Sequence, residues 1–211
     1  MEQRRIEIGT LAAGPLAAGL SGPLVPFAPG RDAGCCRFGA EMAGLAGAFR
    51  VQMEARPGLV LHIASAESGA GVSTVALELA DAAAGMPWRR VLLLRLDAGP
   101  GQENAGPGAP GARFDAAALP AALSAADLDA LPSLCGRLRA AYHLIVVDCP
   151  PVGRQPRFLR AANGPAEVVL VLRAGRTRAP DAAQAMRQVA QRGGCVRGVV
   201  LNAARRSGLF R

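Results

Sequence analysis

The feature that most constrains the fold is a series of short, almost continuously apolar runs separated by segments with helical spacing. Five such runs follow one another along the chain: Leu59–Ser65, Val91–Asp97, His143–Pro151, Glu167–Ala174 and Val196–Asn202. A strand that is apolar throughout is covered on both faces, as in a parallel sheet. Alternation of such strands with helices predicts an α/β domain with three layers and a mostly parallel sheet.

The segments between the strands supply the outer layers. Apolar residues recur three and four positions apart in Phe38–Met53, Val72–Ala84 and Pro180–Gln191, which predicts helices there. The segment Ala116–Ala141 is rich in Ala and Leu, and we expect it to be helical in two pieces divided near Pro132. The stretch from residue 98 to residue 113 is rich in Gly, Pro and Ala, and we expect it to be irregular.

The chain of 211 residues suits one domain, which we place at residues 38–206. Residues 1–37 are expected to form a flexible N-terminal segment, and residues 207–211 a short tail. Ile8–Gly30 carries no charge, but its many prolines and glycines argue against a membrane-spanning helix. Glu2 and Glu7 argue against the positive start of a signal peptide.

The basic residues limit the chemistry that the chain can perform. The net charge is +8, and all 24 basic residues are arginine, so no lysine is present for catalysis or phosphate binding. The arginines are scattered without interleaved aromatic residues, so we expect a solvated surface and no nucleic-acid partner. The five cysteines show no metal-binding spacing and are expected to be reduced thiols of a cytoplasmic protein.

A glycine-rich turn follows the first strand, in the sequence SAESGAGVSTVALELA from residue 65 to residue 80. Backbone N–H groups in such a turn, together with the start of a helix, attract anions. The phosphate-binding P-loop has the pattern G-x-x-x-x-G-K-[ST]. Gly71 supplies its last glycine, Gly69 keeps the turn tight, and Ser73 supplies the hydroxyl that would hold Mg²⁺, with Thr74 beside it.

The same loop departs from the pattern in its charged residue. Val72 stands where the lysine belongs, and Ala66 stands at the first glycine position. Because that lysine stabilises charge on the transferred phosphate, its loss costs several kcal/mol, or roughly 10²–10³ in rate. Glu67 is expected to add negative charge near the phosphates. The backbone amides remain, so weak binding of ATP or ADP with Mg²⁺ stays open.

Further segments match one family in the same order along the chain. They are VLLLRLDAG (91–99), YHLIVVDCPPV (142–152), EVVLVLRAGRTR (167–178) and GCVRGVVLNAARR (194–206). Together with the loop, they resemble the bacterial tyrosine kinases (BY-kinases) of capsule and exopolysaccharide biosynthesis, which are related to the ParA/MinD ATPases. The resemblance covers residues 47–206 and implies a three-layer, P-loop NTPase-like domain.

The resemblance also implies the residues of a nucleotide site. Asp148 corresponds to the Walker B acid and Asp97 to the second of two acids on the preceding strand, whereas Arg95 replaces the first. An aspartate at a strand end before Pro-Pro could equally be a structural cap. The implied cofactor-binding set is Gly69, Gly71, Ser73, Thr74, Asp97 and Asp148, with Ser73 and Asp148 on the metal. No catalytic residue is predicted.

Two other functional features of the family are missing. The family carries a C-terminal tyrosine cluster, but the only tyrosine here is Tyr142, which precedes a buried strand. The family's E-x-x-R-x-x-R assembly motif is matched by Gly47, Arg50 and Met53, so only the middle position is kept. Because the core strands are intact while these features, the lysine and the acidic pair are altered, we expect a degenerate, pseudokinase-like member.

Three functions remain in competition. The leading one is a non-catalytic scaffold or regulator of polysaccharide synthesis and export, held at the inner membrane by a membrane co-polymerase or chain-length regulator. The second is a residual ATPase or tyrosine kinase in which Arg95 or a partner's arginine replaces the lysine. The third is a ParA/MinD-like positioning protein, disfavoured because no amphipathic helix is evident after Asn202. Homo-oligomer formation is left open.

Overall fold

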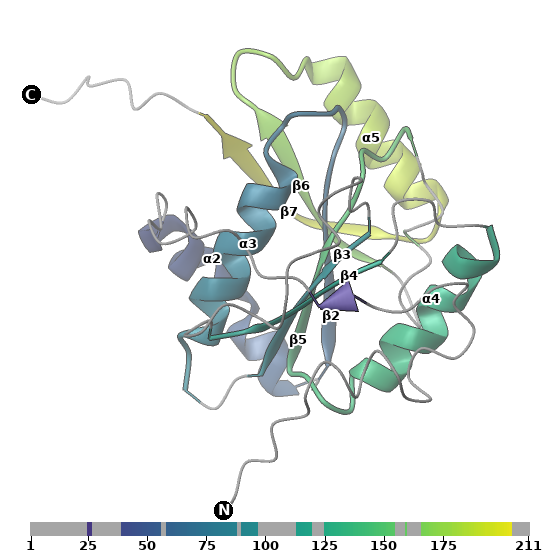
Figure 1. Cartoon of the computed structure of the whole chain (residues 1–211). Coiled ribbons are helices and arrows are strands. Elements are labelled where there is room, and N and C mark those ends of the chain that lie inside the picture. Colours follow the sequence, from purple (N-terminus) through teal and green to yellow (C-terminus); the bar gives the residue numbers. More distant parts are fainter. Residues whose placement is uncertain are drawn as a thin grey trace, which may run out of the picture.

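The computed structural model contains a seven-stranded sheet between two layers of helices (Figure 1). It describes residues 25–26, 39–55, 58–87, 90–96, 113–119, 125–154, 159 and 166–203. The strands are β1 Val25–Pro26, β2 Leu59–Ser65, β3 Val91–Arg95, β4 Asp115–Ala118, β5 Leu144–Asp148, β6 Glu167–Arg173 and β7 Cys195–Asn202. The helices are α2 Gly39–Ala55, α3 Val72–Ala84, α4 Ala125–Leu138 and α5 Ala179–Gln191.

The order of the strands places the glycine-rich loop at the middle of the sheet. The order is β1-β4-β3-β5-β2-β6-β7, and every described neighbouring pair is parallel except β1 with β4. This confirms the α/β fold with a mostly parallel sheet. The chain moves from β2 to one side of the sheet and later returns to the other, so the order reverses beside β2. Ligands of open α/β sheets bind at the carboxyl ends of the strands at such a point.

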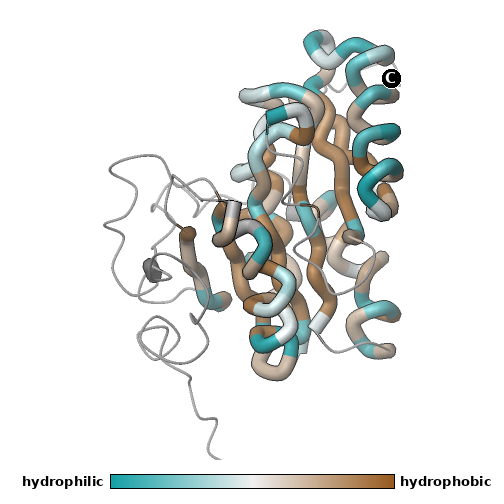
Figure 2. Tube along the Cα trace, turned by 90° about the vertical axis from the view of Figure 1, so that its right-hand side faces the viewer, coloured by the Kyte–Doolittle hydropathy of each residue, from teal (hydrophilic) through white to brown (hydrophobic). Residues whose placement is uncertain are grey.

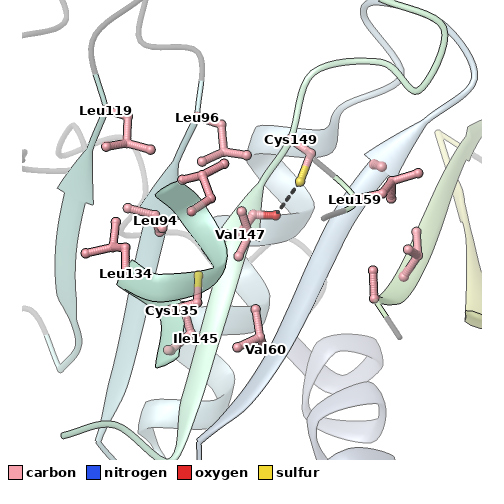
Figure 3. Close-up of a cluster of buried hydrophobic side chains, with 14 of the residues drawn as sticks. Val60, Leu94, Leu96, Leu119, Leu134, Cys135, Ile145, Val147, Cys149 and Leu159 are labelled. Atoms are coloured by element: carbon pink, nitrogen blue, oxygen red, sulfur yellow. Dashed lines mark hydrogen bonds between the residues drawn. The ribbon is translucent and has the colours of Figure 1, made fainter. Parts of the chain in front are cut away.

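Each face of the sheet carries its own apolar cluster, because successive side chains of a strand point to opposite faces. On one face the sheet packs against α2 and α3, and the cluster includes Phe49, Met53 and Leu79. On the other face it packs against α4 through Leu134 and Cys135 (Figure 3). The same cluster includes Val189 of α5. The strands run as a brown, hydrophobic layer between helices whose outer faces are hydrophilic (Figure 2).

The prediction of two helical pieces over Ala116–Ala141 is wrong at its start and at Pro132. Asp115–Ala118 is strand β4, paired in parallel with β3 and antiparallel to β1. Alanine has little preference for strands, so the pairing with neighbouring strands decides the conformation. α4 is a single helix that continues through Pro132. Proline destabilises a helix interior, but apolar side chains on both sides of it bury against the sheet: Leu131, Leu134, Cys135 and Leu138.

Two residues of the N-terminal segment belong to the sheet, since Val25–Pro26 pairs with Ala117 and Ala118. A proline is tolerated on such an edge strand, where its missing N–H interrupts no ladder. The other residues of the predicted flexible segment, most of the predicted irregular stretch and the predicted tail lie outside the described residues. Among the described helices, none combines the length and apolar character needed to cross a membrane.

The buried histidine of β2 predicts an acid-sensitive fold. Burial of His62 lowers its pKa from 6.5 to about 4, so the folded protein holds the ring neutral where the unfolded chain would protonate it. Stability is therefore full above pH 6.5 and is lost as the pH falls toward 4. We expect the free energy of unfolding to drop by about 2 kcal/mol between about pH 7 and pH 5 in urea titrations. His62→Leu should lose that pH dependence; an unchanged slope in this variant would contradict the assignment.

Candidate phosphate-binding site

The loop between β2 and α3 has the backbone shape that the sequence predicts for a phosphate-binding turn. Gly69 and Gly71 have φ angles of 77° and 95°. Residues other than glycine rarely adopt this left-handed backbone conformation. Gly71 is also the N-cap residue of α3, and its carbonyl accepts the amide of Val75 at 3.0 Å. Both glycines are therefore required by the local conformation.

The N-terminus of α3 opens onto a cavity and lacks a side-chain cap. No side chain caps the helix, and its first turn contains no acidic residue. The first N–H groups of a helix have no intrahelical partner and carry partial positive charge. Three residues that carry such N–H groups line a cavity of about 260 Å³: Val72, Ser73 and Thr74. The full lining is Ser65, Glu67, Ser68, Gly69, Gly71, Val72, Ser73, Thr74, Arg95, Asp148, Cys149, Pro150 and Pro151.

An ion pair forms the part of the cavity contributed by β3 and β5. Arg95 and Asp148 are register partners at the carboxyl ends of these parallel strands. The Nε of Arg95 donates to the Oδ2 of Asp148 at 3.2 Å, and their side chains are 18% and 7% exposed. A hydrogen bond between two charged groups is stronger than a neutral one, the more so where water is largely excluded. The Walker B-like carboxylate is therefore already bound to a cation.

The turn after β6 holds the loop from its other side. The Nη1 of Arg173 donates to the carbonyl of Gly69 at 2.9 Å. The hydroxyl of Thr177 donates to the Oε1 of Glu67 at 2.7 Å, and the Nε of Arg176 lies 3.7 Å from the Oε2 of Glu67. Glu67 does line the cavity, as the sequence predicts, but its charge is partly neutralised by Arg176. Its negative charge is therefore weaker toward a bound phosphate than the sequence alone implies.

A second contact fixes the loop just before α3. The side-chain amide of Asn202, the last residue of β7, donates to the carbonyl of Ala70 at 2.8 Å. The hydroxyl of Ser65 donates to the carbonyl of Glu67 at 2.6 Å. Loop carbonyls are thus bound by side chains and turned toward them. The amides at the start of α3 remain at the cavity.

The structure gathers most of the predicted site residues around this one cavity. Gly69, Gly71, Ser73, Thr74 and Asp148 all line it. The sixth predicted residue, Asp97, lies outside the described residues. The binding roles of these residues are predictions from the sequence. The two readings of Asp148, as a nucleotide-site acid and as a structural cap, both stay predictions.

The contacts of Arg173, Arg176, Thr177 and Asn202 with the loop were missed from the sequence. In the sequence, these four residues belong to the closing segments 167–178 and 194–206, and nothing in their spacing points to the loop. The available signal was topological, because the carboxyl ends of parallel strands meet at one edge of a sheet. Polar residues that end a strand next to the loop-bearing strand are expected to reach the loop.

Magnesium, which the fold family implies, does not fit the described side chains as they are arranged. Mg²⁺ in such sites is held by one or two carboxylates together with phosphate oxygens and water. The Oδ2 of Asp148 is bound by the guanidinium of Arg95, so a metal would have to displace a cation. In the part of the chain that the structure describes, His, Cys, Asp and Glu do not form a group of three that could hold a metal.

Comparison with known proteins supports the fold. No family model and no curated protein matches the chain. Among solved structures, it is similar to the kinase domain of the Escherichia coli tyrosine kinase ETK, with a TM-score of 0.64 and 18% identity over 82% of this chain and 80% of that one.

Two further solved structures extend the comparison. The VpsO kinase domain gives a TM-score of 0.61 and 22% identity over 79% of this chain and 96% of that one. MinD from Pyrococcus horikoshii, complexed with Mg-ADP, gives a TM-score of 0.50 and 20% identity over 67% of this chain and 69% of that one. At these identities the likeness establishes that the chain has the fold of bacterial tyrosine kinase domains and MinD-type ATPases.

The close fit of the loop against β7 predicts a steric effect at Gly71. A Cβ on Gly71 would overlap the Nδ2 of Asn202, and the residue would keep a φ of 95°. We expect Gly71→Ala to lower the free energy of unfolding by about 3 kcal/mol or more in urea titrations. Gly69→Ala is the control, because its Cβ would meet no atom closer than 3.8 Å, and it should cost about 1–2 kcal/mol.

A double variant separates overlap from backbone strain. Adding Asn202→Ala to Gly71→Ala removes the overlapping group, so the two changes together should cost less than the sum of the single changes. Strict additivity would show that the contact between Asn202 and the loop is absent in solution.

Proposed function

We propose that this chain is a non-catalytic relative of the BY-kinases that acts as a scaffold or regulator in bacterial capsule or exopolysaccharide synthesis and export. The observation that carries the proposal is the ion pair of Arg95 with Asp148, which lines the same cavity as a loop that has Val72 in place of lysine. The fold and the loop geometry are those of a nucleotide-binding domain. The groups that would act on the transferred phosphate are altered.

The chemical reason is a shortage of positioned positive charge. Phosphoryl transfer depends on a cationic side chain and metal ions that stabilise the transferred group. The side chain of Val72 is uncharged and cannot stabilise the transferred group. The guanidinium of Arg95 is engaged with Asp148. Arg173 and Arg176 contact the loop, but through the carbonyl of Gly69 and the carboxylate of Glu67. All three arginines are thus engaged by groups of the protein itself.

The place of action follows from the resemblance to the BY-kinases. We propose that the domain docks on the cytoplasmic side of a membrane polysaccharide co-polymerase or chain-length regulator and so lies at the inner membrane. Support comes from the matching strand segments and from the shared fold of the ETK and VpsO kinase domains. We include self-association of the domain in the proposal, because it would serve the same scaffold role.

A second candidate is a weak nucleotide-binding protein or residual ATPase of the same pathway. The cavity at the start of α3 favours it, because the loop keeps the shape that binds phosphate. The predicted contacts to ATP or ADP are Gly69, Gly71, Ser73 and Thr74, with Asp97 and Asp148 nearby. The ParA/MinD-like positioning function has the least support, since the residues after Ala203 that would bear on it lie outside the described residues.

The scaffold proposal predicts no phosphoryl transfer. Purified protein with Mg-ATP should release no phosphate and label no tyrosine above the background of a Ser73→Ala control. Val72→Lys alone should not restore turnover, because Arg95 still occupies Asp148. Wild-type turnover that disappears in Ser73→Ala would establish the residual enzyme instead.

The docking proposal predicts a stable membrane partner. Tagged chain recovered from membranes of its own host should carry a polysaccharide co-polymerase with it, identified by mass spectrometry. The yield should be the same for Ser73→Ala, because a scaffold does not depend on phosphate chemistry. Recovery without any polysaccharide assembly protein would count against the scaffold role.

A further inference from the structure

The position of Arg95 sets the kind of ligand that the cavity accepts. The guanidinium lines the cavity and lies 3.2 Å from the carboxylate that a metal ion would need. A divalent cation placed at Asp148 would therefore face a fixed positive charge and would have to displace it. The arrangement opposes magnesium and still offers positive charge to an anion.

The charge balance around the loop points the same way. Among the described residues, five charged side chains line the cavity or contact its loop: Arg95, Arg173, Arg176, Glu67 and Asp148. Three positive and two negative charges leave a balance of +1. Both carboxylates are matched with guanidinium groups, so neither presents a full, unscreened negative charge to an anion in the cavity.

The remaining groups of the cavity are those that bind phosphate oxygens. The α3 N-terminus supplies N–H groups at Val72, Ser73 and Thr74 without a side-chain cap. The side chains of Ser73 and Thr74 are exposed, so their hydroxyls are accessible to a ligand. Hydrogen-bond donors from the helix end meet a cation from β3 across one cavity. This combination fits a group with several negatively charged oxygens.

We infer that this cavity binds a phosphate-bearing anion without magnesium, with the guanidinium of Arg95 supplying positive charge in place of the metal. The inference rests on the proposed function in taking the cavity as a site for binding alone. The ligand class is a di- or triphosphate, which a nucleotide or a free pyrophosphate could provide. The domain would then bind a phosphate compound without consuming it.

The test is titration calorimetry of the full chain with ADP, ATP, pyrophosphate and inorganic phosphate, each in EDTA and in excess MgCl₂. Wild-type protein should bind at least one of the polyphosphates in EDTA, and MgCl₂ should not tighten the binding. Equal binding of pyrophosphate and ADP would assign recognition to the phosphates alone, and binding of nucleotides only would add the nucleoside. Either result supports the inference.

Variants of Arg95 separate its charge from its structural role. Arg95→Gln should weaken binding in EDTA about tenfold or more, and MgCl₂ should now restore part of it, because Asp148 becomes available to a metal. Arg95→Lys, which keeps the charge, should retain metal-free binding and guards against a loss caused by misfolding. Arg113→Gln is the matched control: it removes the same charge at an exposed arginine paired with Asp81, away from the cavity lining, and should leave binding unchanged.

Two results would overturn the inference. One is wild-type binding that appears only with MgCl₂ or strengthens in it. The other is the absence of binding of ADP, ATP and pyrophosphate in EDTA. Neither result touches the scaffold proposal, which fails on ATP turnover or on the lack of a membrane partner.

Discussion

The ion pair between Arg95 and Asp148 is the interaction on which the character of this domain depends. Parallel pairing of β3 with β5 places the two residues side by side at the carboxyl end of the sheet, where ligands of this fold bind. Removing one partner of a buried pair leaves an uncompensated charge and typically costs about 3–5 kcal/mol, and somewhat less at a partly exposed position such as this one. The pair thus engages the Asp148 carboxylate at the edge of the sheet where a ligand of this fold would bind.

The phosphate loop keeps its shape through contacts with the protein itself. Arg173 binds the carbonyl of Gly69 and Asn202 binds that of Ala70, so two adjacent loop carbonyls are held by neighbouring strands. A loop supported in this way is preorganised and does not require a nucleotide to order it. This explains physically how the loop can hold its conformation with Val72 at the position of the P-loop lysine. The same support makes it a suitable fixed surface for binding.

The central architecture could be predicted from the sequence. The prediction failed where the conformation or the contacts of a residue depend on neighbouring strands. Continuous apolar runs identified five of the described strands, including β7 at the edge of the sheet, and the glycine pattern identified the turn in which Gly69 and Gly71 have positive φ. Strand β4 was missed because its alanines have no strand preference and depend on pairing with β3. The pairing of Arg95 with Asp148 and of Arg176 with Glu67 joins residues 53 and 109 positions apart, which spacing alone does not reveal. The sequence shows where residues depart from the family's pattern. The side chains that contact those residues become known only from the register of the sheet.

The most direct measurement is a crystal structure of the chain grown with ADP and MgCl₂. The account predicts an ordered diphosphate at the N-terminus of α3, with Arg95 beside it and still paired with Asp148, and no metal at Asp148. A magnesium ion bridging Ser73 and the phosphates, with Arg95 turned away from Asp148, would contradict it.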